Sequence, residues 1–360
     1  MKILFVVDTL DDGGAGRVVS RLSNEMIKNN DISILTLKSK NVKYNINDKI
    51  NHYHIDDFFK KKYKTKIASI KNVMLLDCSD IVLSFLSKIN LYCILACKSL
   101  KKKIIVSERN DPRKKPNSFF KRIIRNLLYK KADGWVFQTE NAKNYFSSKI
   151  KNNGVIILNP LENKIPYREN VDKNKIVCVG RLVKQKNYKM AIDSFKLVKE
   201  KMPGVKLYIY GDGPEKENIS LYISQNMLND SVILMGNVDN IYDKIKDSNL
   251  FIMTSLYEGL PNALMEALAI GIPCVSTNES NGGAKRLISN GENGYLVEIG
   301  DTSDFSNKMI DALTIDNEKF SNNGIKIREY TDVESVAINW MDYIKKVLNK
   351  VWYLCQKYIS

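Results

Sequence analysis

Short apolar runs alternate along the whole chain with stretches whose apolar residues recur at a helical period. Such alternation of buried strands and amphipathic helices is typical of layered α/β proteins with parallel sheets. In the first half the runs predict strands at residues 2–7, 32–37, 81–85, 104–107, 135–138 and 155–158. In the second half they predict strands at residues 175–180, 205–210, 231–235, 250–254 and 273–276. Helices are expected in the gaps, including residues 188–201, 261–270 and 333–357.

A polar stretch interrupts this alternation once, after Asn159-Pro160 and along residues 162–175. A chain of 360 residues also suits two cores better than one. We therefore predict a first domain at 1–164, a second at 165–332, and a helical segment at 333–360 that packs back on the first. Both domains are expected to be Rossmann-like, with mostly parallel sheets facing across a cleft where ligands bind.

Composition indicates a cytoplasmic protein. No apolar run reaches the roughly 18–20 residues that span a bilayer. The apolar stretch at residues 2–7 is too short for a secretory signal and is expected to form the first strand. The six cysteines contain no C-x-x-C pair and lie mostly among apolar neighbours, as reduced packing residues do.

The net charge of +16 is distributed unevenly. Residues 1–164 carry 32 Lys and Arg against 15 Asp and Glu, whereas residues 165–360 carry 24 against 25. Such an asymmetry favours a first half that faces a polyanion, namely nucleic acid, an anionic membrane or a phosphorylated acceptor. The alternative is a lysine-rich composition without functional meaning, which explains the lysines but not their asymmetry.

The basic half contains one amphipathic stretch, residues 117–131, with its apolar residues at helical spacing. The apolar positions are Phe119, Phe120, Ile123, Ile124, Leu127 and Leu128, and the basic ones expected on the other side are Lys121, Arg122, Arg125, Lys130 and Lys131. This pattern is typical of a helix that lies on an anionic membrane. It equally fits a helix that packs on the sheet of its own domain, and the sequence leaves both open.

The segment from Ser255 to Ala267 leaves a buried strand, turns through Glu258-Gly259-Leu260-Pro261 and enters a helix. The first amides of that helix, at Gly259, Leu260 and Asn262, could face a phosphate. Glu258 and Glu266 lie eight residues apart and could accept hydrogen bonds from sugar hydroxyls. The alternative is that Glu258 complements the helix dipole and Glu266 is a surface residue.

A second segment, Val179 to Asn187, places Arg181 and Lys186 in a loop directly after a buried strand. Two cations at a strand end suit a diphosphate, and arginine can bind one bidentately. Ordinary solvated charges are the alternative, and we expect Lys184 to be one. A third segment, Asp11 to Val18, is a glycine loop after the first strand that does not match G-x-G-x-x-G, so no dinucleotide cofactor is indicated.

Together these segments resemble glycosyltransferase family 4, retaining enzymes of the two-domain GT-B architecture. The resemblance rests on motifs in family order: Gly180-Arg181-Leu182 with Gln185-Lys186-Asn187, Gly211-Asp212-Gly213-Pro214, Gly236-Asn237-Val238, the Glu258/Glu266 pair, and Asn293 to Val297. It implies that Arg181 and Lys186 bind the donor diphosphate and that Glu266 accepts the ribose hydroxyls. It implies that Glu258 contacts the transferred sugar. It also implies that Gly236, Asn237 and Val238 hold the base and that Gly14 approaches the diphosphate or the acceptor.

The chain departs from the family pattern at three positions. Many members carry a His in the loop after the fourth strand, where this chain has Ser107-Glu108-Arg109-Asn110-Asp111-Pro112. Gly16 replaces the Glu of a G-G-A-E-R loop, and the Gly282 to Arg286 segment lacks the usual Glu. The Ser-Glu-Arg-Asn loop resembles a subgroup that builds surface polysaccharides or lipid-linked oligosaccharides. The acceptor-side candidates are Gly16, Arg17, Glu108 and Arg109.

The resemblance implies a retaining transferase that moves a hexose or N-acetylhexosamine from a nucleotide sugar, with UDP expected, to a lipid-linked or polysaccharide-precursor glycan. The expected catalytic residues are Glu258, Arg181 and Lys186. No D-x-D motif occurs, so we expect no metal and no cofactor besides the donor. The expected location is cytoplasmic, with the inner face of the cell membrane bound through 117–131. The alternatives are a sugar-nucleotide epimerase or hydrolase, an inactive glycosyltransferase-like subunit, and a nucleic-acid-binding protein, although no nucleic-acid-binding module appears.

Overall fold

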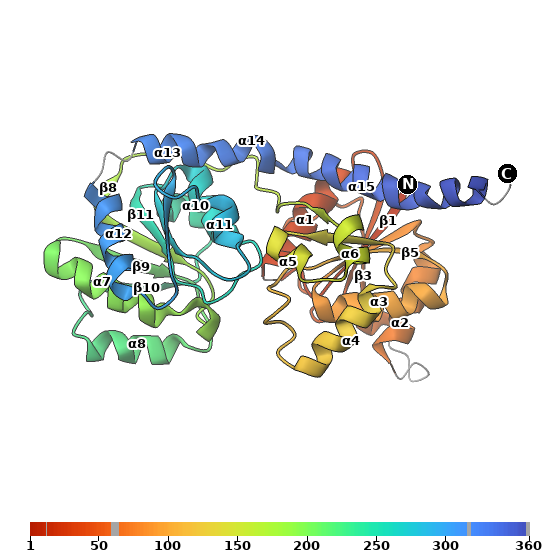
Figure 1. The fold of residues 1–360 in the computed structure, drawn as a ribbon, viewed down its shortest axis with the longest axis horizontal. Coiled ribbons are helices and arrows are strands. Elements are labelled where there is room, and N and C mark those ends of the chain that lie inside the picture. Colours follow the sequence, from red (N-terminus) through yellow and green to blue (C-terminus); the bar gives the residue numbers. More distant parts are fainter. Residues whose placement is uncertain (12, 59–64, 315–317, 358–360) are drawn as a thin grey trace. The chain divides into compact units, whose positions relative to one another are not determined.

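The computed structural model describes residues 1–11, 13–58, 65–314 and 318–357, with 350–357 described by their helical backbone only. The chain divides into two compact units (Figure 1). Unit 1 comprises Met1–Glu162 and Thr331–Ser360, and unit 2 comprises Asn163–Tyr330. Each unit is described by itself.

Unit 1 is a parallel α/β layer structure. Its strands are β1 (Lys2–Val7), β2 (Asp31–Thr36), β3 (Asn51–His54), β4 (Ile81–Phe85), β5 (Lys103–Ser107), β6 (Gly134–Phe137) and β7 (Val155–Ile156). Its helices are α1 (Gly14–Met26), α2 (Lys66–Asp77), α3 (Ser87–Ser99), α4 (Phe119–Tyr129), α5 (Glu140–Asn144), α6 (Ser148–Asn153) and α15 (Val333–Lys357), with the 3-10 turn η1 (Ile55–Phe58).

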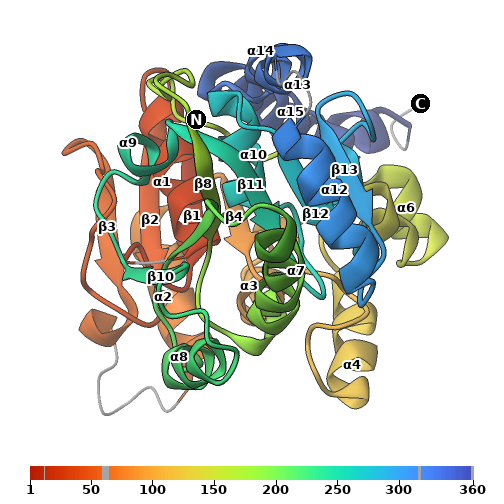
Figure 2. The ribbon, with the colours of Figure 1, turned by 90° about the vertical axis from the view of Figure 1, so that its left-hand side faces the viewer.

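The seven strands of unit 1 run in the order β3-β2-β1-β4-β5-β6-β7, and all pair in parallel. Figure 2 shows β3, β2 and β1 next to one another. Successive residues of β1 point to opposite faces, so Phe5 packs with α1 and α15 while Leu4 packs with α2 and α3. Helix α15 lies along α1 (Figure 1), where Trp340 is fully buried.

Unit 2 repeats this architecture. Its strands are β8 (Asp172–Val179), β9 (Lys206–Tyr210), β10 (Val232–Gly236), β11 (Ser248–Met253), β12 (Cys274–Thr277) and β13 (Gly294–Val297). Its helices are α7 (Tyr188–Lys201), α8 (Lys216–Gln225), α9 (Ile241–Ile245), α10 (Asn262–Ile270), α11 (Gly283–Leu287), α12 (Thr302–Thr314) and α13 (Glu318–Gly324), with the turns η2 (Lys184–Lys186) and η3 (Ile325–Ile327). Helix α14 (Arg328–Thr331) leads into unit 1.

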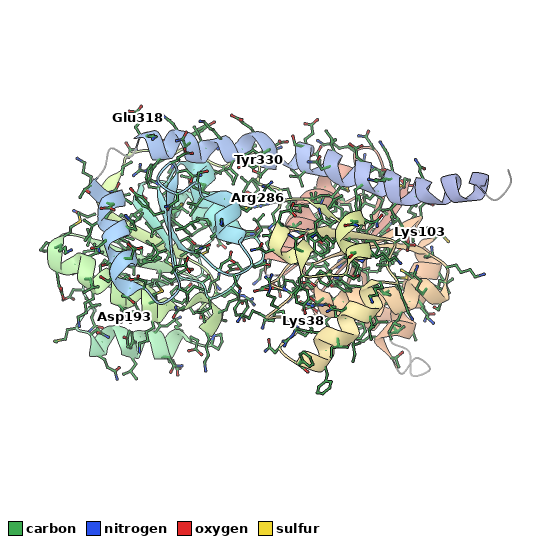
Figure 3. The ribbon with its side chains drawn as sticks, viewed as in Figure 1. Lys38, Lys103, Asp193, Arg286, Glu318 and Tyr330 are labelled. Atoms are coloured by element: carbon green, nitrogen blue, oxygen red, sulfur yellow. The ribbon has the colours of Figure 1, made fainter. Side chains whose placement is uncertain are left out.

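The six strands of unit 2 follow the order β10-β9-β8-β11-β12-β13 and also pair in parallel. Helices α7, α8 and α12 cover one face through a core that includes Phe195, Phe305 and Met309. Helix α10 packs against β11 and β12. Asp193 of α7, labelled in Figure 3, accepts a hydrogen bond of 2.6 Å from Tyr222 of α8, which ties these two helices together.

The expected fold class is confirmed, and the predicted strands are all present. Two strands were not predicted, β3 and β13. Strand β3 reads Asn-His-Tyr-His and pairs only with β2 at the sheet edge, so it lacks the apolar run of a buried strand. The polar run at 162–175 was expected to be a linker throughout, but β8 begins at Asp172 within it. Its first residues are exposed, which explains their polarity.

Candidate functional site

The carboxyl edge of the unit 2 sheet gathers the loops after β8 and β11, because these strands are neighbours. Several hydrogen bonds hold the two loops together. The Leu256 amide donates to the Gln185 carbonyl at 2.8 Å, and the Gln185 side chain donates to the Tyr257 carbonyl at 2.7 Å. The Thr254 hydroxyl donates to the Lys186 carbonyl at 3.0 Å. The Gly180–Asn187 and Ser255–Pro261 segments therefore form one site.

The charged side chains of this site are Arg181, Lys186 and Glu258. Lys186 Nζ lies 2.7 Å from Glu258 Oε1, and both side chains are largely but not fully buried. Arg181 is exposed, and its guanidinium has no hydrogen bond or ion pair with any residue that the structure describes. The site thus has one cation paired with a carboxylate and a second cation that is available to an anion.

Glu266 is buried, with 3% of its surface exposed, so the alternative that it is a surface residue is wrong. It lies four residues after the first residue of α10, just over one helical turn. Its Oε1 accepts a hydrogen bond of 3.2 Å from the hydroxyl of Tyr242 on α9. Pro261 is the N-cap of α10 and makes no side-chain cap hydrogen bond, and Glu258 pairs with Lys186.

Glycines line the ends of β8, β9 and β10. A side chain at Gly211 would place its Cβ 2.1 Å from the Gly180 carbonyl oxygen, so only glycine permits this approach. The Gly211 amide donates to the Gly236 carbonyl at 2.8 Å, which ties the loop of the expected base-binding residues to the edge. Gly236 has a φ of 69° with no atom within 4 Å of its missing Cβ. Asn237 is exposed and Val238 is half-buried.

Glu279, which follows β12, belongs to this edge and was not predicted. Its carboxylate accepts hydrogen bonds of 2.8 Å from the amides of Gly282 and Ala284 at the start of α11. Burial raises the pKa of Glu279 to about 7, although these amides oppose the shift. Asn281 next to it donates to the Glu258 carbonyl at 2.9 Å, which fixes the turn that carries Glu258. The signal in the sequence was an acid three residues before Gly282-Gly283, a spacing that suits a cap of α11.

The glycine loop of unit 1 lies at the start of α1. Gly14 is exposed and is the first residue of the helix. Gly16 is buried, and a Cβ there would lie 2.4 Å from the Thr9 carbonyl oxygen. Gly16 was expected on the acceptor side, and this stays a prediction; in the structure the glycine lets α1 approach the chain after β1. The Arg17 guanidinium lies 5.9 Å from the centre of the Tyr44 ring.

Glu108 was also expected to contact an acceptor, and this stays a prediction; the structure places the residue inside unit 1. Its carboxylate is 1% exposed and accepts hydrogen bonds from the hydroxyls of Ser87, at 2.8 Å, and Tyr129, at 3.0 Å. Arg125 Nη1 lies 3.9 Å away. Burial raises the pKa of Glu108, while Arg125 and the two hydroxyls oppose the shift. The residue holds α4 to the sheet.

Arg109, the next residue, is placed differently. Its guanidinium lies 4.8 Å from the centre of the Phe85 ring, and Nη1 donates to Asn159 Oδ1. Burial lowers the pKa of Arg109 to about 9. Phe85 ends β4 and Asn159 follows β7, so Arg109 lies at the carboxyl edge of the unit 1 sheet. Among the acceptor-side candidates, Arg109 therefore stands out by two properties. It lies at this edge, and its charge forms no ion pair with an acid among the described residues.

Helix α4 exposes the apolar stripe that the sequence predicted. Phe119 is 63% exposed and Phe120 75%, and Ile123, Ile124 and Leu127 are also exposed. The alternative that this stripe packs on the sheet of its own domain is wrong, and side chains of α4 project outward in Figure 3. Arg125 was expected on the solvated basic face but is fully buried, with donors to the carbonyls of Lys115 and Pro112. The helix therefore faces its unit through Arg125 and Tyr129.

The described residues show neither a cluster of metal ligands nor a membrane-spanning helix. Within the described ranges, no three or more His, Cys, Asp and Glu side chains gather so that they could hold a metal ion. No helix in the described part of the chain is long and apolar enough to cross a bilayer. The expectation that the chain needs no metal stays a prediction.

Comparison with known proteins finds similarity to glycosyltransferases. Residues 161–327 match the family model described as "Glycosyl transferases group 1", which covers nearly all of unit 2. A relative from Campylobacter jejuni is 27% identical over 365 residues, covering 97% of this chain and 99% of that protein. It is named GalNAc-alpha-(1->4)-GalNAc-alpha-(1->3)-diNAcBac-PP-undecaprenol alpha-1,4-N-acetyl-D-galactosaminyltransferase.

Two solved structures share the fold over nearly the whole chain. Anabaena Alr3699/HepE in complex with UDP and glucose has a TM-score of 0.82 at 16% identity, covering 96% of this chain and 99% of that one. A mutant of S. aureus TarM in complex with Fondaparinux, alpha-GlcNAc-glycerol and UDP has a TM-score of 0.80 at 16% identity, with coverages of 95% and 99%. At these identities the likeness shows the fold alone.

Proposed function

Because the second unit of this chain belongs to the glycosyl transferases group 1 family, we propose that the chain is a retaining glycosyltransferase that uses a UDP-sugar. The transferred sugar in this proposal is a hexose or N-acetylhexosamine, and the acceptor is a lipid-linked or polysaccharide-precursor glycan. The family resemblance and the GT-B fold expected from the sequence are confirmed, and both support a glycosyltransferase activity. The names of the relative and of the HepE and TarM complexes support the donor and the acceptor class.

The observation that carries the proposal is the charge arrangement at the unit 2 edge. Lys186 is held by Glu258 at 2.7 Å, and Arg181 beside it is exposed and unpaired among the described residues. A donor diphosphate would bind Arg181 bidentately and attract Lys186, since it carries more charge than one carboxylate. Glu258 would then be released to accept a hydrogen bond from a hydroxyl of the transferred sugar.

The proposed reaction retains the anomeric configuration. The bond between the anomeric carbon and the donor phosphate oxygen breaks, and the acceptor hydroxyl oxygen forms the new bond on the same face. The acceptor's proton passes to the leaving phosphate oxygen. Arg181 and Lys186 stabilise the negative charge that develops on the diphosphate, a role for which preorganised cations are effective. Buried Glu266 would accept the ribose hydroxyls.

A thermal-shift screen against UDP, GDP, ADP and dTDP tests the donor site. We expect UDP to raise the melting temperature of the wild type and the shift to be lost in Arg181→Ala and Glu266→Gln. The second substitution keeps the volume of a buried residue and removes its charge. No shift with any nucleotide at millimolar concentration would count against an active transferase. Proton NMR of the transfer product then reports the configuration, and inversion would exclude the proposed mechanism.

We propose further that α4 binds an anionic membrane and brings the site to a lipid-linked acceptor. Its exposed phenylalanines would insert at the interface while neighbouring Lys121 binds lipid phosphates. Replacing Phe119 and Phe120 by Ser should weaken binding to anionic vesicles at least tenfold without changing the melting temperature, because both rings are already exposed. Leu221→Ser, at an equally exposed leucine on α8, is the control and should leave binding unchanged. Equal vesicle binding by the Phe variant would refute the membrane role.

A further inference from the structure

The buried arginines of unit 1 differ in how their donors are used. Arg125 is fully buried, and all three of its nitrogens donate: Nε to Asn126, Nη1 to the Lys115 carbonyl, and Nη2 to the Pro112 carbonyl. The Glu108 carboxylate 3.9 Å away compensates its charge. Arg125 is therefore satisfied by the protein itself.

Arg109 is only 9% exposed, yet two of its three nitrogens have no partner. Nη1 donates to Asn159 Oδ1, whereas Nε and Nη2 are buried and bond to nothing that the structure describes. Glu108, the nearest acid in the chain, faces away toward Ser87 and Tyr129. A buried guanidinium with unmade hydrogen bonds and no counter-charge is costly, because donors taken out of water need acceptors.

The two unpartnered nitrogens lie on the same edge of the Arg109 guanidinium. Nε and Nη2 form one edge of the planar guanidinium, and their N–H bonds run parallel along that edge. Such an edge fits the two oxygens of a carboxylate or phosphate group, the bidentate arrangement that arginine favours. The ring of Phe85 against the guanidinium face and the bond to Asn159 fix the plane, so the edge is preorganised.

The position also suits a ligand. Arg109 follows β5, Phe85 ends β4 and Asn159 follows β7, all at the carboxyl edge of the unit 1 sheet. Ligands of open parallel sheets bind at that edge. Asn159 Oδ1 also accepts a hydrogen bond of 2.5 Å from Gln138, which follows β6. This second bond fixes the position of Asn159, the partner of Arg109.

We propose that the Nε–Nη2 edge of Arg109 is an oxyanion-binding subsite of unit 1, taking a phosphate or carboxylate group carried by a substrate. This inference rests on the proposed function for what the substrate is, since a lipid-linked acceptor carries phosphate and an acidic sugar carries carboxylate. The subsite itself rests on the burial and the unmade hydrogen bonds of one side chain.

The test uses small anions on the full chain in the Arg181→Ala background, which removes the exposed guanidinium of the proposed donor site. Melting temperature is measured with pyrophosphate, with glucuronate, and with chloride at the same ionic strength. At ten times the dissociation constant we expect a rise of about 3 °C with at least one of the two oxyanions and none with chloride. Response to pyrophosphate alone identifies a phosphate as the group, and response to glucuronate alone a carboxylate.

The matched variant is Arg181→Ala/Arg109→Lys, which keeps the charge but lacks the two-nitrogen edge. It should lose the oxyanion response. If it does not melt cooperatively, Arg109→Gln replaces it, because glutamine keeps a donor toward Asn159. An equal response in the variant would overturn the subsite. So would the absence of any oxyanion response in the background protein at anion concentrations up to ~50 mM. UDP binding by Arg109→Lys, with Arg181 intact, is recorded in parallel, so that failure of the donor site is seen separately.

Discussion

The two sheets have the same order of their first six strands, but different groups form their carboxyl edges. In unit 2 the edge consists of glycine backbone, with Arg181 exposed and Lys186 paired to Glu258 at a partly exposed site. In unit 1 the corresponding edge is a buried side-chain network in which Glu108 joins Ser87, Tyr129 and Arg125.

The difference separates charges that are paired within the fold from charges that have no partner among the described residues. Glu108 and Arg125 are buried with their partners present, so removing either leaves an uncompensated group inside the protein. Arg181 has no partner to lose, so its removal should leave the fold unchanged. Arg109 combines both conditions, since it is buried like Arg125 but unpaired like Arg181.

The largest expected effect follows from breaking the unit 1 network. Glu108→Ala should lower the free energy of unfolding by about 4 kcal/mol, because Arg125 loses its counter-charge and two hydroxyls lose their acceptor. Urea unfolding followed by tryptophan fluorescence measures this, since Trp135, Trp340 and Trp352 all belong to unit 1. Glu140→Ala, at an exposed acid of α5, is the control. A loss below about 1 kcal/mol would mean that the network does not hold α4.

Glu279 offers a pH test of a buried acid at the unit 2 edge. Its pKa is raised from 4.5 to about 7. Its contribution to stability is therefore full below pH 4.5 and is lost as the pH rises through 7, because ionisation is penalised in the folded state. Glu279→Gln does not titrate at this position. The stability of the wild type relative to the variant should fall by about 3 kcal/mol between pH 4.5 and 8.

The measurement for Glu279 is urea unfolding by circular dichroism, which reports both units, with tryptophan fluorescence reporting unit 1 alone. Glu292→Gln, at an exposed acid nearby, should show no such pH dependence. If the wild type and Glu279→Gln keep a constant difference across this range, the folded and unfolded states titrate alike and the pKa of Glu279 is not raised.

These two acids also show what the sequence could not predict. The strands at 2–7 and 81–85 and the helix at 188–201 were predicted with the correct bounds, because their apolar pattern reflects burial directly. Polar residues carry no such signal. Nothing in Ser107-Glu108-Arg109 shows that the first charge is satisfied inside the unit and the second is not.

Helix α4 is a second case in which the sequence did not show which residues are buried. Its apolar stripe was evident, but the face toward the protein is the one that carries Arg125 and Tyr129. A helical period identifies two faces and does not say which one is buried when the inner face is polar. The positions of the unit 2 loops at 180–187 and 255–261 were predictable because each follows an apolar strand and leads into a helix. The partner of each residue in the free protein, Glu258 for Lys186, required the structure.

A smaller effect, on binding alone, is expected from Arg181. Arg181→Ala should weaken UDP binding about 30-fold, roughly 2 kcal/mol, because a charge-assisted contact to the diphosphate is lost. The melting temperature without ligand should not change, since the side chain is exposed and unpaired among the described residues. Lys184→Ala is the matched control, an exposed cation three residues along, and should bind UDP as the wild type does. Isothermal titration calorimetry measures the UDP affinity of both variants. Equal weakening in both would mean that UDP responds to the net positive charge of the loop and not to Arg181 itself.

The smallest expected effect tests whether the glycine edge of unit 2 serves a ligand or only the backbone. Gly236 and Gly300 both have positive φ, 69° and 93°, and neither has an atom within 4 Å of its missing Cβ. Alanine at either position should therefore cost only about 1 kcal/mol of stability, from the backbone conformation. If the Gly236 loop holds the base, Gly236→Ala should also weaken UDP binding about fivefold, roughly 1 kcal/mol, because its methyl enters the space of the ligand. Gly300→Ala should not. The same UDP affinity in both variants would show that the glycine at the end of β10 serves the backbone, and the contrast between the two edges would then rest on the charges alone.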